Sequence, residues 1–146
     1  MRIDFYQLSR DPVEKVVPLL AGKVLGSAAC NRLLIVSGDE AQRAALAKAL
    51  WEADGFLANG MANAPHAERQ PVLLSDGCAA ANGAAMVLIA DGQWREEAAE
   101  FGRALLLFDE AATGAARELW QALAAREGVE RRIFKQTPQG GWREGA

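Results

Sequence analysis

The sequence is poor in residues that bind soft metals or form disulfides. Two cysteines, Cys30 and Cys78, and one histidine, His66, occur among 146 residues, and the cysteines show no CxxC spacing. Zinc sites and disulfide frameworks need more such residues at short spacings. We therefore expect no metal site, two cysteines that serve as small packing residues, and a histidine in an exposed loop.

The chain also lacks a long apolar run and an excess of positive charge. Its longest weakly polar stretch, "GCAAANGAAMVLIADG", is broken by Asn82 and is shorter than the roughly 20 apolar residues of a membrane span. The first residues, "MRIDFYQLSRD", carry charges throughout, unlike a signal peptide. A net charge of −3 argues against a surface that covers nucleic-acid phosphates. We expect a cytoplasmic protein in which any anion site is local.

What the sequence does contain is an alternation of strand and helix signals through one domain, residues 1–146. Apolar runs such as "RLLIV" are typical of strands covered on both faces, and Asp11 before Pro12 is typical of a helix N-cap. Strands are expected at 2–8, 32–36, 71–75, 85–90, 103–109 and 131–136, and helices at 12–29, 40–52, 93–102 and 113–127. Residues 53–70 are expected to form a long irregular connection. This order predicts a three-layer α/β domain with a mostly parallel sheet.

A glycine-marked turn after a buried strand calls for a search for nucleotide-binding motifs. The turn "IVSGDEAQ" has one glycine where a dinucleotide fingerprint has three, and it lacks the GK[ST] of a P-loop. Asp39 and Glu40 would also repel a phosphate there. The turns after two later strands, 75–77 and 91–92, have ordinary turn residues. The fold is thus expected to be Rossmann-like without a nucleotide-binding loop, and we expect no cofactor.

Two groups of aromatic residues indicate binding surfaces. Arg117 and Trp120 lie on one side of the last expected helix, where they suit a peptide carboxylate next to an aromatic side chain. The alternative is a boundary tryptophan stacked under Arg117. Trp51 ends the second helix and Phe56 follows it. Spacing alone fits equally well an apolar stripe with Leu50 in the core and an exposed patch at the helix end.

Several segments in order resemble the chi subunit of bacterial DNA polymerase III, a clamp-loader accessory protein. They are "DFYQL", "LLIVSGDEAQRAALAKALW" with "GFLANG", "RQPVLLS" and "ARELWQ…G…RIFKQTPQGGW", and they span nearly the whole chain. The resemblance implies a noncatalytic subunit in DNA replication, not an enzyme. It would link the clamp loader, through the psi subunit, to the acidic carboxyl-terminal tail of single-stranded-DNA-binding protein. The alternative is an α/β enzyme with an unrecognised active site, which would need a cleft with perturbed ionisable groups.

The resemblance also assigns a tail-binding pocket to the last helix. The family motif of alanine, arginine, glutamate, any residue, an aromatic residue and lysine falls on residues 116–121, where Arg117 and Trp120 match. Gln121 and Thr113 stand at positions where the family usually has cations. Charge from the last expected strand would compensate, and the candidates there are Arg131, Arg132 and Lys135.

A second assigned surface binds psi, and it falls on Trp51, Phe56 and Leu57. In the family a leucine, a proline and a histidine follow the phenylalanine, whereas this chain has Leu57, Ala58 and Asn59. This departure leaves a helicase or another part of the clamp loader as an alternative partner for the same patch.

Overall fold

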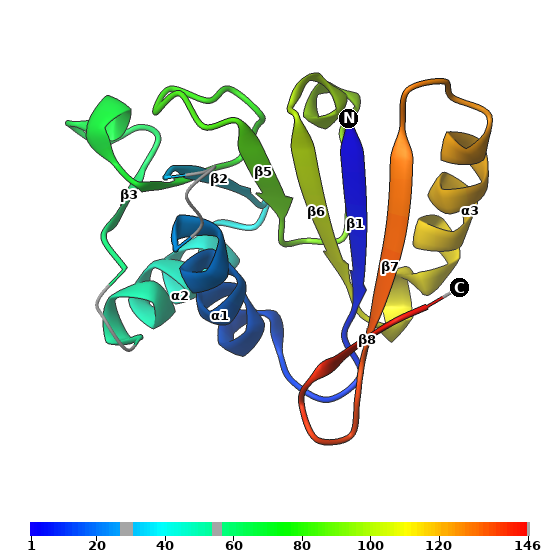
Figure 1. Cartoon of the computed structure of the whole chain (residues 1–146). Coiled ribbons are helices and arrows are strands. Elements are labelled where there is room, and N and C mark those ends of the chain that lie inside the picture. The colour runs from blue at the N-terminus through cyan, green and yellow to red at the C-terminus, as the bar shows by residue number, and fades with distance from the viewer. Residues whose placement is uncertain (27–30, 54–56, 146) are drawn as a thin grey trace.

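The structure is a computed structural model, which describes residues 1–26, 31–53 and 57–145. In these residues eight strands form one sheet in the order β3-β4-β2-β5-β6-β1-β7-β8 (Figure 1). The strands are β1 (Arg2–Gln7), β2 (Leu33–Val36), β3 (Asn59–Met61), β4 (Val72–Ser75), β5 (Met86–Ile89), β6 (Arg103–Phe108), β7 (Glu130–Gln136) and β8 (Trp142–Glu144). Neighbouring strands pair in parallel except β8, which is antiparallel to β7.

Helices cover both faces of the sheet. On one face lie α1 (Val13–Leu25) and α2 (Glu40–Glu52), and on the other lies α3 (Thr113–Ala124) with the 3-10 turns η1 (Ala67–Arg69), η2 (Glu96–Glu100) and η3 (Glu110–Ala112). Strand β2 contributes Leu33 and Ile35 to the apolar cluster under α1 and α2, and Leu34 and Val36 to the cluster on the α3 side. The predicted three-layer α/β fold is therefore confirmed. No described helix is long and apolar enough to cross a bilayer.

Two expectations about local structure are wrong. Asp11 does not cap α1, because Pro12 takes the cap position without a side-chain bond and the Asp11 carboxylate accepts instead from Gln136 Nε2 at 2.8 Å. The segment 53–70 is not irregular throughout, since it contains β3 and η1. Strand β3 is only three residues long and pairs with β4 at the sheet edge. Such a short strand is defined by its backbone pairing, and its three residues show no apolar periodicity in the sequence.

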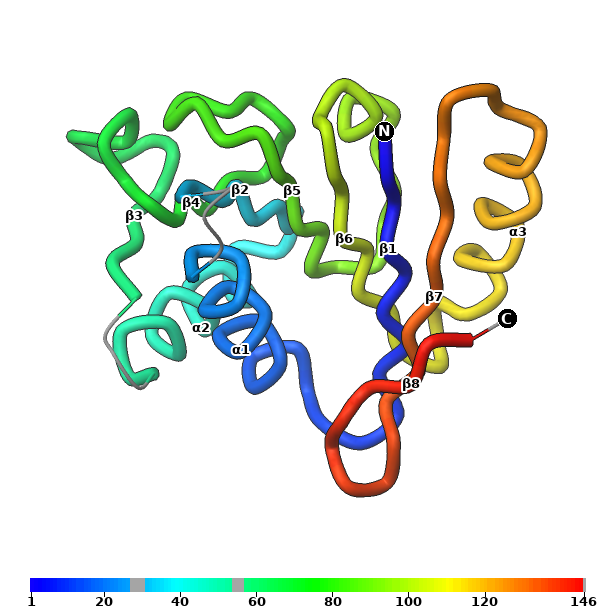
Figure 2. Tube along the Cα trace, in the orientation of Figure 1, coloured from blue at the N-terminus to red at the C-terminus, as the bar shows by residue number. Residues whose placement is uncertain are grey.

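Segments near the two ends of the sequence pair with one another in the sheet. β1 lies between β6 and β7, which Figure 2 shows as the blue strand beside the orange one. Beyond β7 the chain turns back into β8, which sequence patterning missed, and Trp142 packs edge-on against Tyr6 at 5.1 Å. The buried Gln136 side chain accepts backbone N–H bonds at 2.9–3.2 Å from the loop after β1, residues 9–11. This contact fixes the end of β7 against that loop.

Candidate protein-binding sites

A cavity of about 260 Å³ lies between α3 and the strands β1, β6 and β7. Its apolar lining consists of Phe5, Phe108, Ala116, Trp120 and Ile133, and its polar lining of Gln7, Thr113, Arg117 and Lys135. We call this cavity the α3 pocket. The structure thus brings together four of the residues predicted from the sequence: Thr113, Arg117, Trp120 and Lys135. Gln121 is exposed and does not line it.

The apolar part of the α3 pocket is built from aromatic rings that meet edge to face. Phe5 lies between the two others, at 6.3 Å and 78° from Phe108 and at 5.2 Å and 79° from Trp120. Edge-to-face pairs are the favourable arrangement for aromatic quadrupoles. A further ring that enters the cavity therefore meets both ring edges and ring faces.

Two cations stand at the α3 pocket without an acidic partner. The side chains of Arg117 and Lys135 are both exposed, and neither forms an ion pair or a hydrogen bond with another residue in the described part of the chain. Arg117 lies on α3 and Lys135 lies near the end of strand β7, so two elements place positive charge at the cavity. Such a site suits a ligand that carries an anion beside an apolar group.

The other two cations of β7 are placed differently, because successive side chains of a strand point to opposite faces. Arg131 lies on the α3 side, where its guanidinium carbon is 4.2 Å from the Trp120 ring centroid and its Nη1 donates to the Trp120 carbonyl oxygen at 2.6 Å. Arg132 points away from α3 and pairs with Glu130 at 2.9 Å and Glu144 at 3.7 Å. The residue stacked on Trp120 is therefore Arg131, and the expected alternative of Arg117 in that role is wrong.

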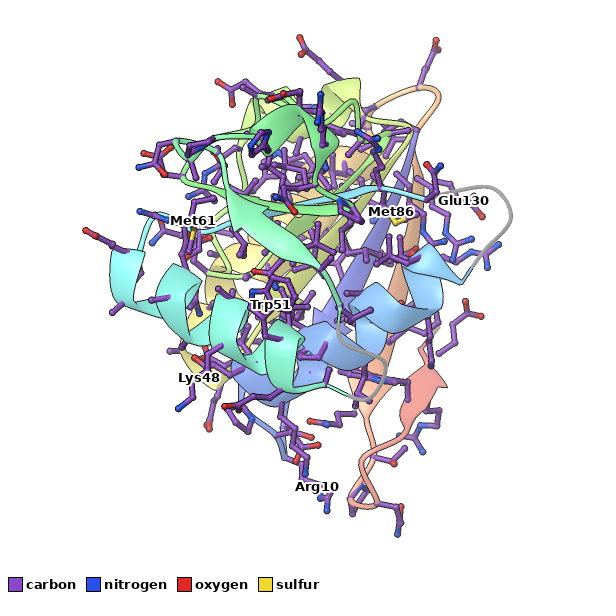
Figure 3. The ribbon with its side chains drawn as sticks, turned by 90° about the vertical axis from the view of Figure 1, so that its left-hand side faces the viewer. Arg10, Lys48, Trp51, Met61, Met86 and Glu130 are labelled. Atoms are coloured by element: carbon purple, nitrogen blue, oxygen red, sulfur yellow. The ribbon has the colours of Figure 1, made fainter. Side chains whose placement is uncertain are left out.

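The second candidate surface lies at the end of α2. Trp51 is 49% exposed while its neighbour Leu50 is fully buried, so Trp51 belongs to the surface and not to the core stripe. Figure 3 shows Trp51 and Lys48 on α2, which faces the viewer. Leu57 is half-buried and packs against the core, and Phe56 lies outside the described residues, as does Cys30.

Sequence reasoning missed one exposed apolar residue on the same side of the sheet. Leu19 of α1 is 61% exposed, and among the described residues only Leu19 and Trp51 are large, apolar and exposed. Leu19 borders a groove of about 450 Å³ between α1 and α2, which Leu57 also lines. The signal was present in the sequence, since the buried stripe Val16, Val17, Leu20, Ala21 and Val24 leaves Leu19 on the outer side of the helix.

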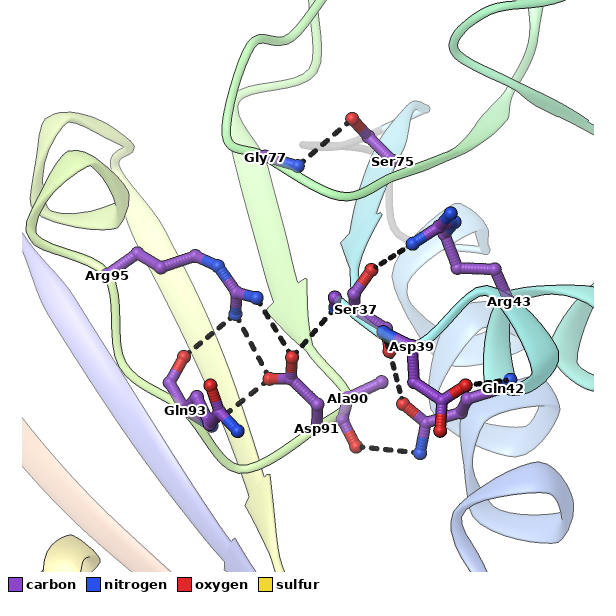
Figure 4. A network of polar contacts seen from close by, with 11 residues as sticks. Ser37, Asp39, Gln42, Arg43, Ser75, Gly77, Ala90, Asp91, Gln93 and Arg95 are labelled. Carbon is purple, nitrogen blue, oxygen red and sulfur yellow. Dashed lines mark hydrogen bonds and ion pairs between the residues drawn. The ribbon is translucent and has the colours of Figure 1, made fainter.

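The turn before α2, where many α/β proteins bind phosphate, lines a cavity of about 480 Å³, but carboxylates already accept from its backbone N–H groups (Figure 4). Asp91, which follows β5, accepts from the Gly38 N–H at 2.9 Å, and it pairs with Arg95 through bonds of 2.9 and 3.0 Å. Burial by itself would raise the pKa of Asp91, but the bonds from Arg95, Gly38 and Gln93 outweigh it and hold that pKa below its usual value. Asp39 caps α2 through the Gln42 N–H at 3.2 Å. Both carboxylates occupy positions that a phosphate would need.

The layers, the parallel sheet and the α3 pocket define a Rossmann-like α/β domain with an open pocket beside its last helix. The family described as DNA polymerase III chi subunit, HolC, matches residues 1–130, and the chain belongs to this family. The resemblance read from the sequence is thereby confirmed, and it places the protein in DNA polymerase III and in DNA replication. No match was found among curated proteins. Strand β7 begins at the last matched residue, so Arg131, Ile133 and Lys135 lie beyond the matched segment.

Proposed function

We propose that this protein is a single-domain, noncatalytic subunit that links the clamp loader to protein-coated single-stranded DNA. The α3 pocket binds the acidic carboxyl-terminal tail of single-stranded-DNA-binding protein. The surface around Trp51 binds psi or a psi-like part of the clamp loader. The protein acts in the cytoplasm and contacts nucleic acid only through its partners.

One observation carries the first half of this proposal: an aromatic-walled cavity lies beside two cations that have no acidic partner in the described residues. An acidic peptide that ends in phenylalanine and a free carboxylate matches each part of the cavity. Its ring extends the edge-to-face contacts of Phe5 and Trp120. Arg117 offers paired donors to the terminal carboxylate, and Lys135 attracts the acidic residues upstream.

Titration of this tail peptide against the purified protein tests the pocket. We expect Arg117→Ala to lose about 1.5–3 kcal/mol of binding free energy, the usual worth of a hydrogen bond to a charged group. Arg132→Ala is the matched control, because it removes the same charge from the opposite face of the sheet. A peptide without its final phenylalanine should bind much more weakly. If the wild type, Arg117→Ala and the shortened peptide give the same affinity, the tail does not bind in this pocket.

The partner surface rests on the exposure of Trp51, which a monomer has no structural need to leave outside. We expect Trp51→Ala to lose about 1–3 kcal/mol of binding to psi, as hot-spot aromatic residues do, with little change in stability. Lys48→Ala on the same helix is the control, since its side chain is exposed and makes only a long ion pair of 4.0 Å with Glu52. Unfolding of Trp51→Ala would contradict the assignment, and capture of a helicase instead of psi would change the partner.

The enzyme alternative would use the cavity of about 480 Å³ at the turn before α2, where the pKa of Asp91 is lowered, but the charges there do not suit a nucleotide. Asp91 already occupies the Gly38 N–H, and Asp39 and Glu40 add negative charge to the same helix end. We expect the purified protein to bind neither ATP nor NAD in calorimetric titrations. A micromolar affinity for either nucleotide would overturn this part of the proposal.

A further inference from the structure

Trp120 is a wall of the α3 pocket that contacts both another wall and a side chain outside the cavity lining. Phe5 meets it edge-on at 5.2 Å, and the Arg131 guanidinium lies over the indole at 4.2 Å from its centroid. The same guanidinium donates to the Trp120 carbonyl oxygen at 2.6 Å, so the Arg131 side chain contacts both the ring and the backbone of Trp120.

Arg131 takes this position because of its place in the sheet. β7 pairs in parallel with β1, and Arg131 lies opposite Ile3, whose side chain is buried in the cluster on the α3 side. Alternation along the strand then directs Arg131, Ile133 and Lys135 toward α3. Ile133 and Lys135 line the cavity, but Arg131 does not. Its charge is therefore directed at Trp120 and not at the cavity.

We propose that Arg131 is a positioning residue that fixes the Trp120 indole as the aromatic wall of the α3 pocket, and that it does not itself contact the ligand. The inference rests on the proposed function only for the identity of the ligand, the acidic tail. A planar guanidinium can stack on a ring and donate sideways at the same time, which a lysine ammonium cannot do. Arg131 therefore sets the preference for an aromatic end group, whereas Arg117 and Lys135 set the preference for negative charge.

The first test uses the free protein and needs no ligand. The indole N–H signal of Trp120 is assigned in a ¹H–¹⁵N spectrum by comparison with Trp120→Phe. We expect this signal to shift or broaden in both Arg131→Lys and Arg131→Ala, and to stay in place in Arg132→Ala. The lysine variant keeps the charge and the strand, so it answers the question even if the alanine variant does not fold. An unchanged signal in Arg131→Lys would overturn the proposal.

The second test separates positioning from charge through binding of the tail peptide at several salt concentrations. We expect Arg131→Lys and Arg131→Ala to weaken binding by a similar factor, roughly three- to tenfold, without a change in the slope of log affinity against log salt concentration. Lys135→Ala should instead reduce that slope. If Arg131→Lys binds like the wild type while Arg131→Ala lowers the slope, Arg131 is an ordinary charge contact. If the wild type does not bind the peptide, the proposed function fails, and the indole signal still decides the role of Arg131.

Discussion

The turn before α2 and the α3 pocket lie at the same edge of the sheet, where parallel strands end, but their charges are arranged in opposite ways. At the turn, Asp91 is paired with Arg95 and with the Gly38 N–H. At the pocket, Arg117 and Lys135 have no such partner among the described residues. General experience with open α/β sheets directs attention to the first region. Both regions line a cavity, so they differ in their charges, which are paired at the turn and have no acidic partner among the described residues at the α3 pocket.

The largest expected difference between the two regions is in stability. Asp91→Ala removes the acidic partner of Arg95 and the acceptor of the Gly38 N–H, and we expect a loss of about 1–3 kcal/mol in the free energy of unfolding. Arg117→Ala should change it by less than about 0.5 kcal/mol, as exposed substitutions usually do. Urea denaturation measures both, with Asp76→Ala as an exposed aspartate control. Equal losses in Asp91→Ala and Arg117→Ala would break the comparison.

Salt should affect the two regions unequally. Between about 50 and 200 mM salt we expect binding of the acidic peptide to weaken several-fold, because exposed charges are screened over about 10 Å. The stability difference between the wild type and Asp91→Ala should change little, since the side chains of Asp91 and Arg95 are only 11% and 20% exposed. Calorimetry and urea denaturation at the same salt concentrations test both statements. A peptide affinity that does not change with salt concentration would mean that Arg117 and Lys135 do not bind an anion.

Acid should reduce the advantage of the Asp91 pair, and this is the smallest of the three effects. The pKa of Asp91 is lowered in the folded state, so its contribution is complete above the unfolded value of about 3.9 and is lost as the pH falls through the lower folded value. The stability gap between the wild type and Asp91→Ala should stay constant from pH 7 to 5 and narrow below about pH 4. Urea denaturation at pH 7, 5 and 3.5 measures the gap. A gap that narrows between pH 7 and 5 would show that another group is responsible.

The sequence predicted those elements whose side chains alone define them. α2 was expected at residues 40–52 and is found there, with Asp39 at its N-cap. The edge strands β3 and β8 were missed, since each has three residues and depends on backbone pairing with a neighbour. Helices and buried strands can therefore be read from one sequence more safely than sheet edges.

The candidate site was predictable to a similar extent. Arg117 and Trp120 are three residues apart on one helix, so their spacing predicted that they lie together, and both line the α3 pocket. Strand alternation also contained enough information to separate Arg132 from Arg131 and Lys135. The hydrogen bond from the Gly38 N–H to Asp91 joins residues 53 positions apart, and no local pattern shows such a contact. Sequence motifs could reject a phosphate loop but could not show that Asp91 accepts from the Gly38 N–H.

The position of β1 between two strands has a consequence for how the chain folds as it leaves the ribosome. Its neighbours are β6 and β7, and the loop after β1 is held by Gln136, which lies 127 positions from Ser9. β1 thus has no neighbour to pair with until β6 has been synthesised, and its second side stays open to other chains until β7 follows. Pairing over such distances in sequence is slow. We expect the nascent protein to reach its native sheet only after β7 has left the ribosome.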